Sequence, residues 1–193
     1  MVKSPTEALS IQPRLETARC ILRPAESSDL SALVAAVRSP SFPQRLPLAQ
    51  MASLEKLSRW LEQMCLRSTQ GSAFLWSIDL KEQVLCVGQI TLSPKPSSTA
   101  WSIAFWLNPT QWGRGLATET VSRVIRSAFE TLNIPELWAG VALWNHRSIA
   151  TLERLGLQFL RDSSAGYVVA GVPEPVHEFH LTREQRQRAQ CNA

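Results

Sequence analysis

The sequence lacks the residues and runs that build disulfide frameworks, metal clusters and membrane spans. Its four cysteines, among 193 residues, form neither a CxxC pair nor another metal-ligand spacing. No apolar run approaches the roughly 18 residues of a membrane-spanning helix, and the N-terminus does not have the pattern of a signal peptide. We therefore expect a cytoplasmic protein with no metal, no membrane partner and free thiols at Cys20, Cys65, Cys86 and Cys191.

A strong excess of one charge is also missing. The formal net charge is +4, from 20 Lys and Arg against 16 Asp and Glu. Half of that excess comes from the C-terminal tail, where Arg183, Arg186 and Arg188 stand against Glu184. Because the other basic residues are scattered, no nucleic-acid partner is expected. Apolar residues at 45% and charged residues at 19% are typical of a folded globular chain.

Length and segment composition predict one domain with short extensions. A chain of this size buries a single substantial core. We place an N-terminal leader at residues 1–13, the domain at 14–183 and a basic C-terminal tail at 184–193.

Apolar periodicity predicts an alternation of strands and helices inside that domain. Helices are expected over residues 27–37, 53–67, 117–132 and 147–155. Strands are expected over residues 19–24, 73–80, 84–92, 101–107, 137–144, 157–162, 167–172 and 176–182. Early hairpins followed by strand–helix–strand units indicate one α/β domain built on a mixed sheet.

A Gly–Arg–Gly segment stands where a predicted strand runs into a predicted helix. Gly113 and Gly115 flank Arg114 there. The start of a helix carries unpaired amides and the positive end of the dipole, so glycines can let a phosphate approach closely. A tight turn that needs positive φ is the alternative. A P-loop is excluded because no GK[ST] follows, and Thr118 replaces the third glycine of a dinucleotide fingerprint.

The surrounding motifs resemble one family. "WGRGLATE" at 112–119 and "NHRSIATLERLGLQF" at 145–159 resemble the GNAT superfamily of acyl-CoA-dependent N-acetyltransferases. They are most similar to its RimJ/RimL-like branch, the ribosomal-protein-alanine N-acetyltransferase type. The opening "LETARCILRPAESSDL" and the closing "HEFHLTREQ" resemble the same branch, so the resemblance covers roughly residues 14–185.

The resemblance implies a GNAT-like domain with a mostly antiparallel twisted sheet, flanking helices and strands that splay at an acetyl-CoA site. Loop amides would hold the pyrophosphate of this co-substrate, and a strand backbone would pair with its pantetheine arm. The implied loop residues are Trp112, Gly113, Arg114, Gly115, Leu116, Ala117 and Thr118. The implied strand residues are Phe105, Trp106 and Leu107.

The resemblance also suggests catalytic candidates near the thioester. Asn145 and Ser148 match the polar pair of the family, and both belong to the implied acetyl-CoA site. His146 lies beside them and can relay a proton near neutral pH. Simpler roles stay open, because Asn145 also fits a helix N-cap and Ser148 an ordinary first-turn serine.

Two positions depart from the superfamily pattern. Leu152 stands where many members carry an acidic tyrosine, and the only tyrosine, Tyr167, has no family match to an acid. Ser102 stands where a strand glutamate often acts as the base. Trp60 and Trp106 are candidates for the walls of an acceptor cleft.

The sequence therefore predicts an acetyl-CoA-dependent N-acetyltransferase. The acceptor would be a primary amine, on a protein N-terminus or a small molecule. Direct attack in a ternary complex is expected because no Cys–His nucleophile pair is apparent. A non-catalytic acyl-CoA-binding or regulatory module of the same fold is the alternative, motivated by Ser102 and Leu152. The expected assembly is a monomer or a homodimer.

Overall fold

The computed structural model describes residues 12–51 and 53–191. Most of the predicted leader, residues 1–11, lies outside the described residues. The first described residues are hydrogen-bonded to the sheet. The side chain of Gln12 donates to the Leu75 carbonyl at 2.8 Å, and the Trp76 indole donates to the Pro13 carbonyl at 2.8 Å.

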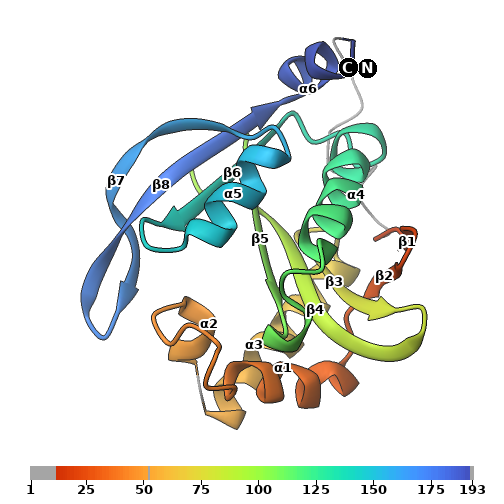
Figure 1. Cartoon of the computed structure of the whole chain (residues 1–193), viewed down its shortest axis with the longest axis vertical. Helices are drawn as coiled ribbons and strands as arrows, with labels where there is room; N and C mark the ends of the chain where they lie inside the picture. The colour runs from red at the N-terminus through yellow and green to blue at the C-terminus, as the bar shows by residue number, and fades with distance from the viewer. Residues whose placement is uncertain (1–11, 52, 192–193) are drawn as a thin grey trace.

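One eight-stranded sheet organises the chain (Figure 1). Its strands lie in the order β1-β2-β3-β4-β5-β6-β8-β7, and every neighbouring pair is antiparallel except β5 and β6. The strands are β1 (Leu15–Glu16), β2 (Cys20–Pro24), β3 (Phe74–Leu80), β4 (Gln83–Pro94), β5 (Trp101–Leu107), β6 (Glu136–Ala142), β7 (Gln158–Val169) and β8 (Val172–Thr182). This arrangement confirms the predicted mixed α/β domain.

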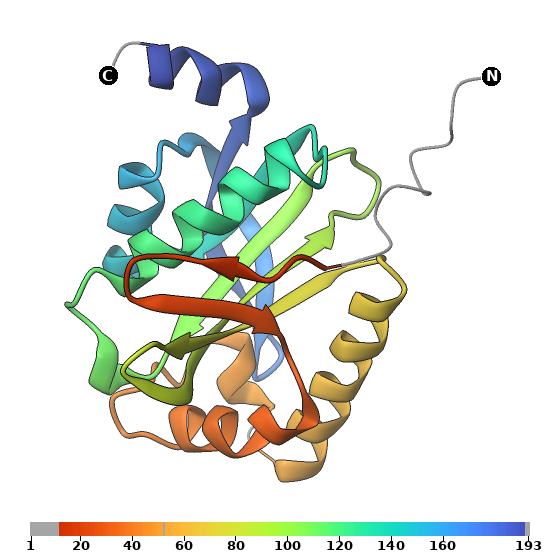
Figure 2. The ribbon, with the colours of Figure 1, turned by 90° about the vertical axis from the view of Figure 1, so that its right-hand side faces the viewer.

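Helices cover both faces of the sheet (Figure 2). The longer ones are α1 (Leu30–Val37), α3 (Leu54–Thr69), α4 (Leu116–Glu130), α5 (His146–Arg154) and α6 (Arg183–Cys191). Short helical turns are η2 (Ser27–Asp29), α2 (Pro47–Gln50) and η3 (Pro109–Gln111). The apolar side chains of α4 join the main core, whereas α1 and α3 build two separate apolar clusters. Strand β3, which lies between these layers, is buried along its whole length.

The C-terminal hairpin differs from its prediction. The sequence indicates three strands over 157–162, 167–172 and 176–182, but the structure has two. Ala170 and Gly171 both have positive φ, 49° and 83°, and form the turn between β7 and β8. The apolar run 167–172 therefore bends at its middle instead of continuing as one strand. The proline-rich loop after α1 also contains the helix α2, which begins at Pro47.

A buried ion-pair network joins β2, β3 and the start of α1. Asp29, 4% exposed, accepts from Arg23 Nη2 at 2.6 Å, from the Ser77 hydroxyl at 2.7 Å and from the Glu26 amide at 2.9 Å. Arg23 Nε also donates to Asp79 at 2.8 Å. Burial by itself raises the pKa of Asp29, but these donors outweigh it and hold that pKa below its usual value.

The network continues toward the middle of the sheet. Gln89 on β4 donates to the Ser77 hydroxyl at 3.2 Å, and the Trp106 indole on β5 donates to the Gln89 side-chain oxygen at 3.2 Å. The indole is thus connected through three hydrogen bonds to a buried carboxylate.

We predict that Asp29→Asn lowers the free energy of unfolding at pH 7 by about 2–3 kcal/mol. This is less than the usual cost of breaking a buried ion pair, because Arg23 retains its ion pair with Asp79. Because the pKa of Asp29 is lower in the folded protein than in the unfolded chain, the carboxylate stabilises the fold at pH values above the unfolded-state pKa of about 3.9. This stabilisation is lost as the pH falls through the folded-state pKa. Urea unfolding at pH 7 and from pH 5 to 3 should show the two proteins converging in acid. A difference that does not depend on pH would contradict this account.

Candidate active site

The site lies where β5 and β6 separate. The two strands pair in parallel only at Trp101↔Leu137 and Ser102↔Trp138, near the start of β5. Beyond these pairs β5 continues beside β4, and β6 continues beside β8. A cavity of about 1390 Å³ reaches into the gap, lined by β5, β6, α5 and the loop before α4.

The glycine loop forms one rim of this cavity. Gly113 and Gly115 both have φ of 76°, a left-handed conformation that glycine adopts without strain. Gly115 is the N-cap of α4 and provides no side-chain cap, so the amides of the first turn have no intrahelical partner. The positive φ angles confirm the tight turn, and the free amides beside it leave the anion-site explanation as a prediction.

A surface ion pair fastens this loop to the start of β2. Arg19 contacts Glu119 at 2.6 Å, its backbone amide donates to the same carboxylate at 2.9 Å, and its guanidinium donates to the Arg114 carbonyl at 2.8 Å. Burial raises the pKa of Glu119, but hydrogen bonds from Thr17 and Arg19 outweigh it, and the pKa is lowered. The ionised carboxylate therefore keeps a structural role.

The structure places nearly all of the predicted site residues around this one cavity. Arg114 is the exception, because its side chain bonds to Gln111 and is absent from the lining. The predicted residues that line the cavity are Phe105, Trp106, Leu107, Trp112, Gly113, Gly115, Leu116, Ala117, Thr118, Asn145, His146 and Ser148.

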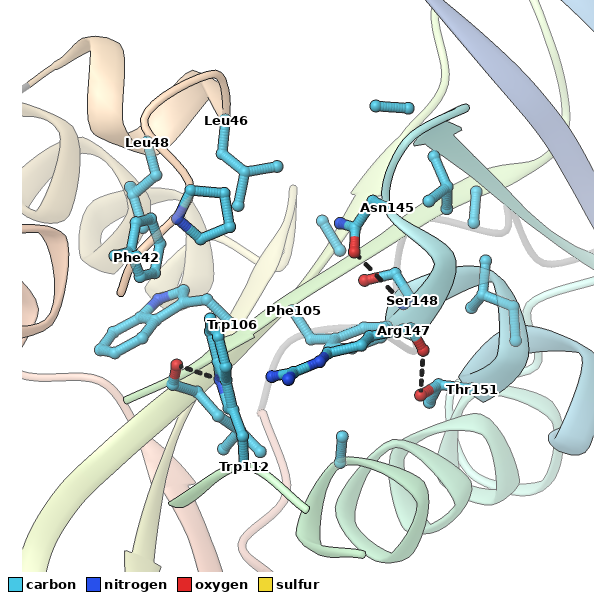
Figure 3. A pocket seen from close by; sticks show the side chains of 18 of the residues that line it. Phe42, Leu46, Leu48, Phe105, Trp106, Trp112, Asn145, Arg147, Ser148 and Thr151 are labelled. Atoms are coloured by element: carbon cyan, nitrogen blue, oxygen red, sulfur yellow. Dashed lines mark hydrogen bonds between the residues drawn. The ribbon is translucent and has the colours of Figure 1, made fainter. Parts of the chain in front are cut away.

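The start of α5 forms the opposite rim (Figure 3). Asn145 is the N-cap of this helix, and its side-chain oxygen accepts from the Ser148 amide at 3.3 Å. The Ser148 side chain itself points into the cavity (Figure 3). The guanidinium of Arg147 lies 4.9 Å from the ring centre of Trp112, a cation–π contact that spans the two rims. Asn145 therefore has a capping role whatever its role toward a ligand.

The end of the cavity near α2 is apolar and held by a second ion pair. Arg45 Nη2 contacts both oxygens of Glu174 at 2.8 Å, although 62% of its side chain is exposed. The Trp144 indole donates to the same carboxylate at 2.8 Å. This contact ties the segment before α2 to the β7–β8 hairpin. No sequence signal marks it, because 129 positions separate Arg45 from Glu174.

Tyr167 is a lining residue that the motif comparison passes over. Its hydroxyl is buried and has no hydrogen-bond partner among the described residues. Burial raises its pKa to about 12, with a further contribution from Glu174. The phenol is therefore protonated at neutral pH and can only donate or accept a hydrogen bond there.

A carboxylate base is missing from the lining of this cavity. Among the described lining residues none is Asp, Glu, Lys or Cys, and His146 is the one histidine. Ser102 does not reach the cavity. It lines a smaller one of about 370 Å³ together with Trp138, Lys95 and Glu178.

Comparison with known proteins identifies the family. Residues 19–158 match the model of the acetyltransferase (GNAT) domain, so the chain belongs to the GNAT acetyltransferase family and is an acetyltransferase. The uncharacterized N-acetyltransferase YoaA of Bacillus subtilis is 27% identical over 149 residues, which are 76% of this chain and 83% of YoaA. The predicted family is confirmed.

Solved structures agree on the fold. The ribosomal L7/L12 α-N-protein acetyltransferase RimL in complex with coenzyme A has a TM-score of 0.78 at 18% identity, covering 88% of this chain and 98% of RimL. Mycobacterium smegmatis RimJ in complex with CoA-disulfide has a TM-score of 0.75 at 16% identity and covers 93% of each chain. At such identities the likeness extends to the fold alone.

No described helix has the length and apolar character to cross a membrane. Within residues 12–51 and 53–191, no group of three or more His, Cys, Asp or Glu side chains is arranged to hold a metal ion.

We predict that Asn145→Ala lowers the free energy of unfolding by about 1 kcal/mol through the loss of the N-cap. Asn145→Asp should keep nearly full stability, because aspartate caps a helix equally well and carries a favourable charge at its N-terminus. Urea unfolding of the ligand-free proteins measures both changes. Equal stability of the alanine variant and the wild type would show that the cap contributes nothing.

Proposed function

We propose that this acetyltransferase moves the acetyl group of acetyl-CoA to a primary amine by direct attack in a ternary complex. The supporting observation is that one cavity contains both a helix start with free amides and the separated edge of β5. An extended co-substrate with a phosphate end and an amide-containing arm fits that combination. The rest of the same cavity leaves room for an acceptor.

The glycine loop and β5 would divide the binding of acetyl-CoA. The first-turn amides of α4, from Leu116 to Thr118, would hold the pyrophosphate, aided by the helix dipole. The backbone of Phe105–Leu107 has no partner on β6, so it can pair with the pantetheine amides. A backbone amide in this region would also stabilise the oxyanion that forms when the amine adds to the thioester carbonyl.

The remaining steps concern one proton and one leaving group. The amine nitrogen forms a bond to the thioester carbon, loses a proton, and the carbon–sulfur bond breaks as the CoA thiolate departs. His146, exposed at the start of α5, can take the amine proton directly or through water. Ser148, two residues further along the helix, would donate a hydrogen bond to the departing sulfur.

An acyl-enzyme route has less support. The described cysteines Cys20, Cys65 and Cys86 are absent from the cavity lining, and burial raises the pKa of each thiol. Such thiols are poor nucleophiles at neutral pH. This observation supports direct attack of the acceptor on the thioester.

A panel of amines tests the function as a whole. Release of CoA thiol from acetyl-CoA, measured with each amine and without one, should reveal amine-dependent turnover. A protein that binds acetyl-CoA but releases no thiol with any of the amines would instead be a non-catalytic acyl-CoA-binding module. Leu152 and Ser102 leave this module as the second candidate.

We predict that Gly115→Ala weakens acetyl-CoA binding about tenfold or more, because a methyl group intrudes where the phosphate must approach the amides. Gly156→Ala is the matched control. It has a similar φ of 85°, lies after α5 outside the cavity lining, and should bear the same backbone strain without loss of affinity. Calorimetric titration measures both. Equal affinities for the two variants would remove the glycine loop from the binding site.

We predict that Ser148→Ala lowers kcat about ten- to a hundredfold, near or below the low end of general acid catalysis. Affinity for acetyl-CoA should stay nearly unchanged, as expected when an interaction of the transition state is lost. The N-cap is retained, because Asn145 bonds to the backbone amide of residue 148.

Thr151→Ala provides the control for this variant. Thr151 lies one turn further along α5, and its hydroxyl is already committed to the Arg147 carbonyl at 2.8 Å. We expect it to keep kcat close to the wild-type value. If Ser148→Ala also keeps full kcat, the serine has no part in thiolate departure.

A further inference from the structure

The end of the cavity away from the glycine loop is an apolar wall. It is built on the cluster that α1 and α3 form around Leu33 and Leu57. The side chains of this cluster that face the cavity are Phe42, Leu46, Leu48, Met51, Trp60 and Trp106. Most of them are only partly buried in the protein, so their remaining apolar surface is available to a ligand. Figure 3 shows Phe42, Leu46, Leu48 and Trp106 on one side of the opening, opposite Asn145 and Ser148.

The central member of this wall is held in one orientation. The Trp106 indole donates to Gln89, Gln89 donates to Ser77, and Ser77 donates to Asp29. Because Asp29 is also fixed by Arg23, the chain of bonds ends on a rigid ion pair. The indole therefore presents a preformed flat surface instead of one that must be ordered on binding.

The charges around the cavity are of the wrong sign for a polycation. No carboxylate lines the cavity among the described residues, whereas Arg147 and Arg154 do. Glu174 is bonded to Trp144 at the edge of the lining, but both of its oxygens are already taken by Arg45. An acceptor with several ammonium groups would bring unpaired charges against an apolar surface, at a considerable cost in free energy.

The ion pair between Arg45 and Glu174 limits the size of the acceptor. Arg45 directly precedes the wall residue Leu46, and Glu174 pairs in the sheet with Tyr167 of the opposite lining. The Arg45–Glu174 contact thus joins the two sides of this end of the cavity. A small molecule fits such a bridged end better than the terminus of a folded protein.

Resting on the proposed function, we propose that the acceptor is a small primary amine carried on an uncharged aromatic body. The aromatic body would lie against Trp106 and the leucines, with its amine directed toward β5 and Ser148. Burial of a phenyl ring on an apolar wall strengthens binding about tenfold or more relative to a polar group of similar size. The class expected is the arylalkylamines, and polyamines are expected to be poor acceptors.

The test compares 2-phenylethylamine with spermidine in two assays. Thiol release gives kcat/KM for each amine, and calorimetric titration of the CoA-saturated protein gives the affinity without turnover. We expect at least about a tenfold preference for 2-phenylethylamine in both assays. Equal or better use of spermidine would overturn this inference and leave the acetyltransferase proposal intact. Binding of 2-phenylethylamine without thiol release would support the acceptor site and count against the catalytic proposal. Absence of both binding and turnover would overturn the acceptor class.

Two variants sharpen the assignment. Trp106→Leu should raise KM for 2-phenylethylamine about tenfold, a larger effect than on KM for acetyl-CoA, because the pantetheine arm would contact residue 106 through its backbone. Trp138→Leu is the matched control, because this half-buried indole also donates to a side chain, Glu178, but lines only the smaller cavity. An equal rise of KM in both variants would mean that the effect is structural.

A reversal of the charge pattern tests the inference independently of Trp106. Leu48→Asp adds the missing carboxylate to the wall, so it should raise kcat/KM for spermidine and lower it for 2-phenylethylamine. No change in the ratio of the two values in a folded Leu48→Asp protein would show that this wall does not meet the acceptor.

Discussion

Parallel hydrogen bonding between β5 and β6 ends after Ser102 and Trp138, and the site depends on that interruption. A sheet that stayed paired along both strands would fill the gap with backbone contacts and leave no cavity. Because β5 remains bonded to β4 and β6 to β8, each strand keeps a rigid neighbour on its other side. The separated edges are therefore held apart by the rest of the sheet, which makes the opening a fixed feature.

Both rims of the opening are helix starts, and each begins with a residue suited to its position. Gly115 adopts the left-handed conformation that the turn into α4 requires, and Asn145 caps α5 with its side chain. Gly115 leaves the first amides of α4 without a partner, whereas the side-chain oxygen of Asn145 accepts a hydrogen bond from the first turn of α5. The two rims thus differ chemically, one suited to an anion and the other to the reacting end of a ligand.

Two buried carboxylates, Asp29 and Glu174, support the apolar end of the cavity through their hydrogen-bond partners. Asp29 is bonded to Arg23 and Ser77 and, through Gln89, fixes the orientation of the Trp106 indole. Glu174 is neutralised by Arg45 and joins the β7–β8 hairpin to the segment before α2. Each removes its own charge from the cavity while it fixes part of the wall. An apolar end of the cavity near α2 is the physical consequence.

The sequence by itself determined the family, the mixed sheet and most residues of the cavity rim, because these depend on local signals. The strand–glycine–helix junction at 107–116 and the apolar period of α4 are readable from neighbouring residues. Only the tertiary structure decided the apolar end of the cavity. The Arg45–Glu174 contact joins residues 129 positions apart, and the pairing of Trp106 with Gln89 depends on strand register. The turn at Ala170 and Gly171, misassigned as strand, likewise reflects the pairing of β7 with β8. Such long-range contacts leave no periodic trace in the sequence, since their partners are chosen by packing in three dimensions.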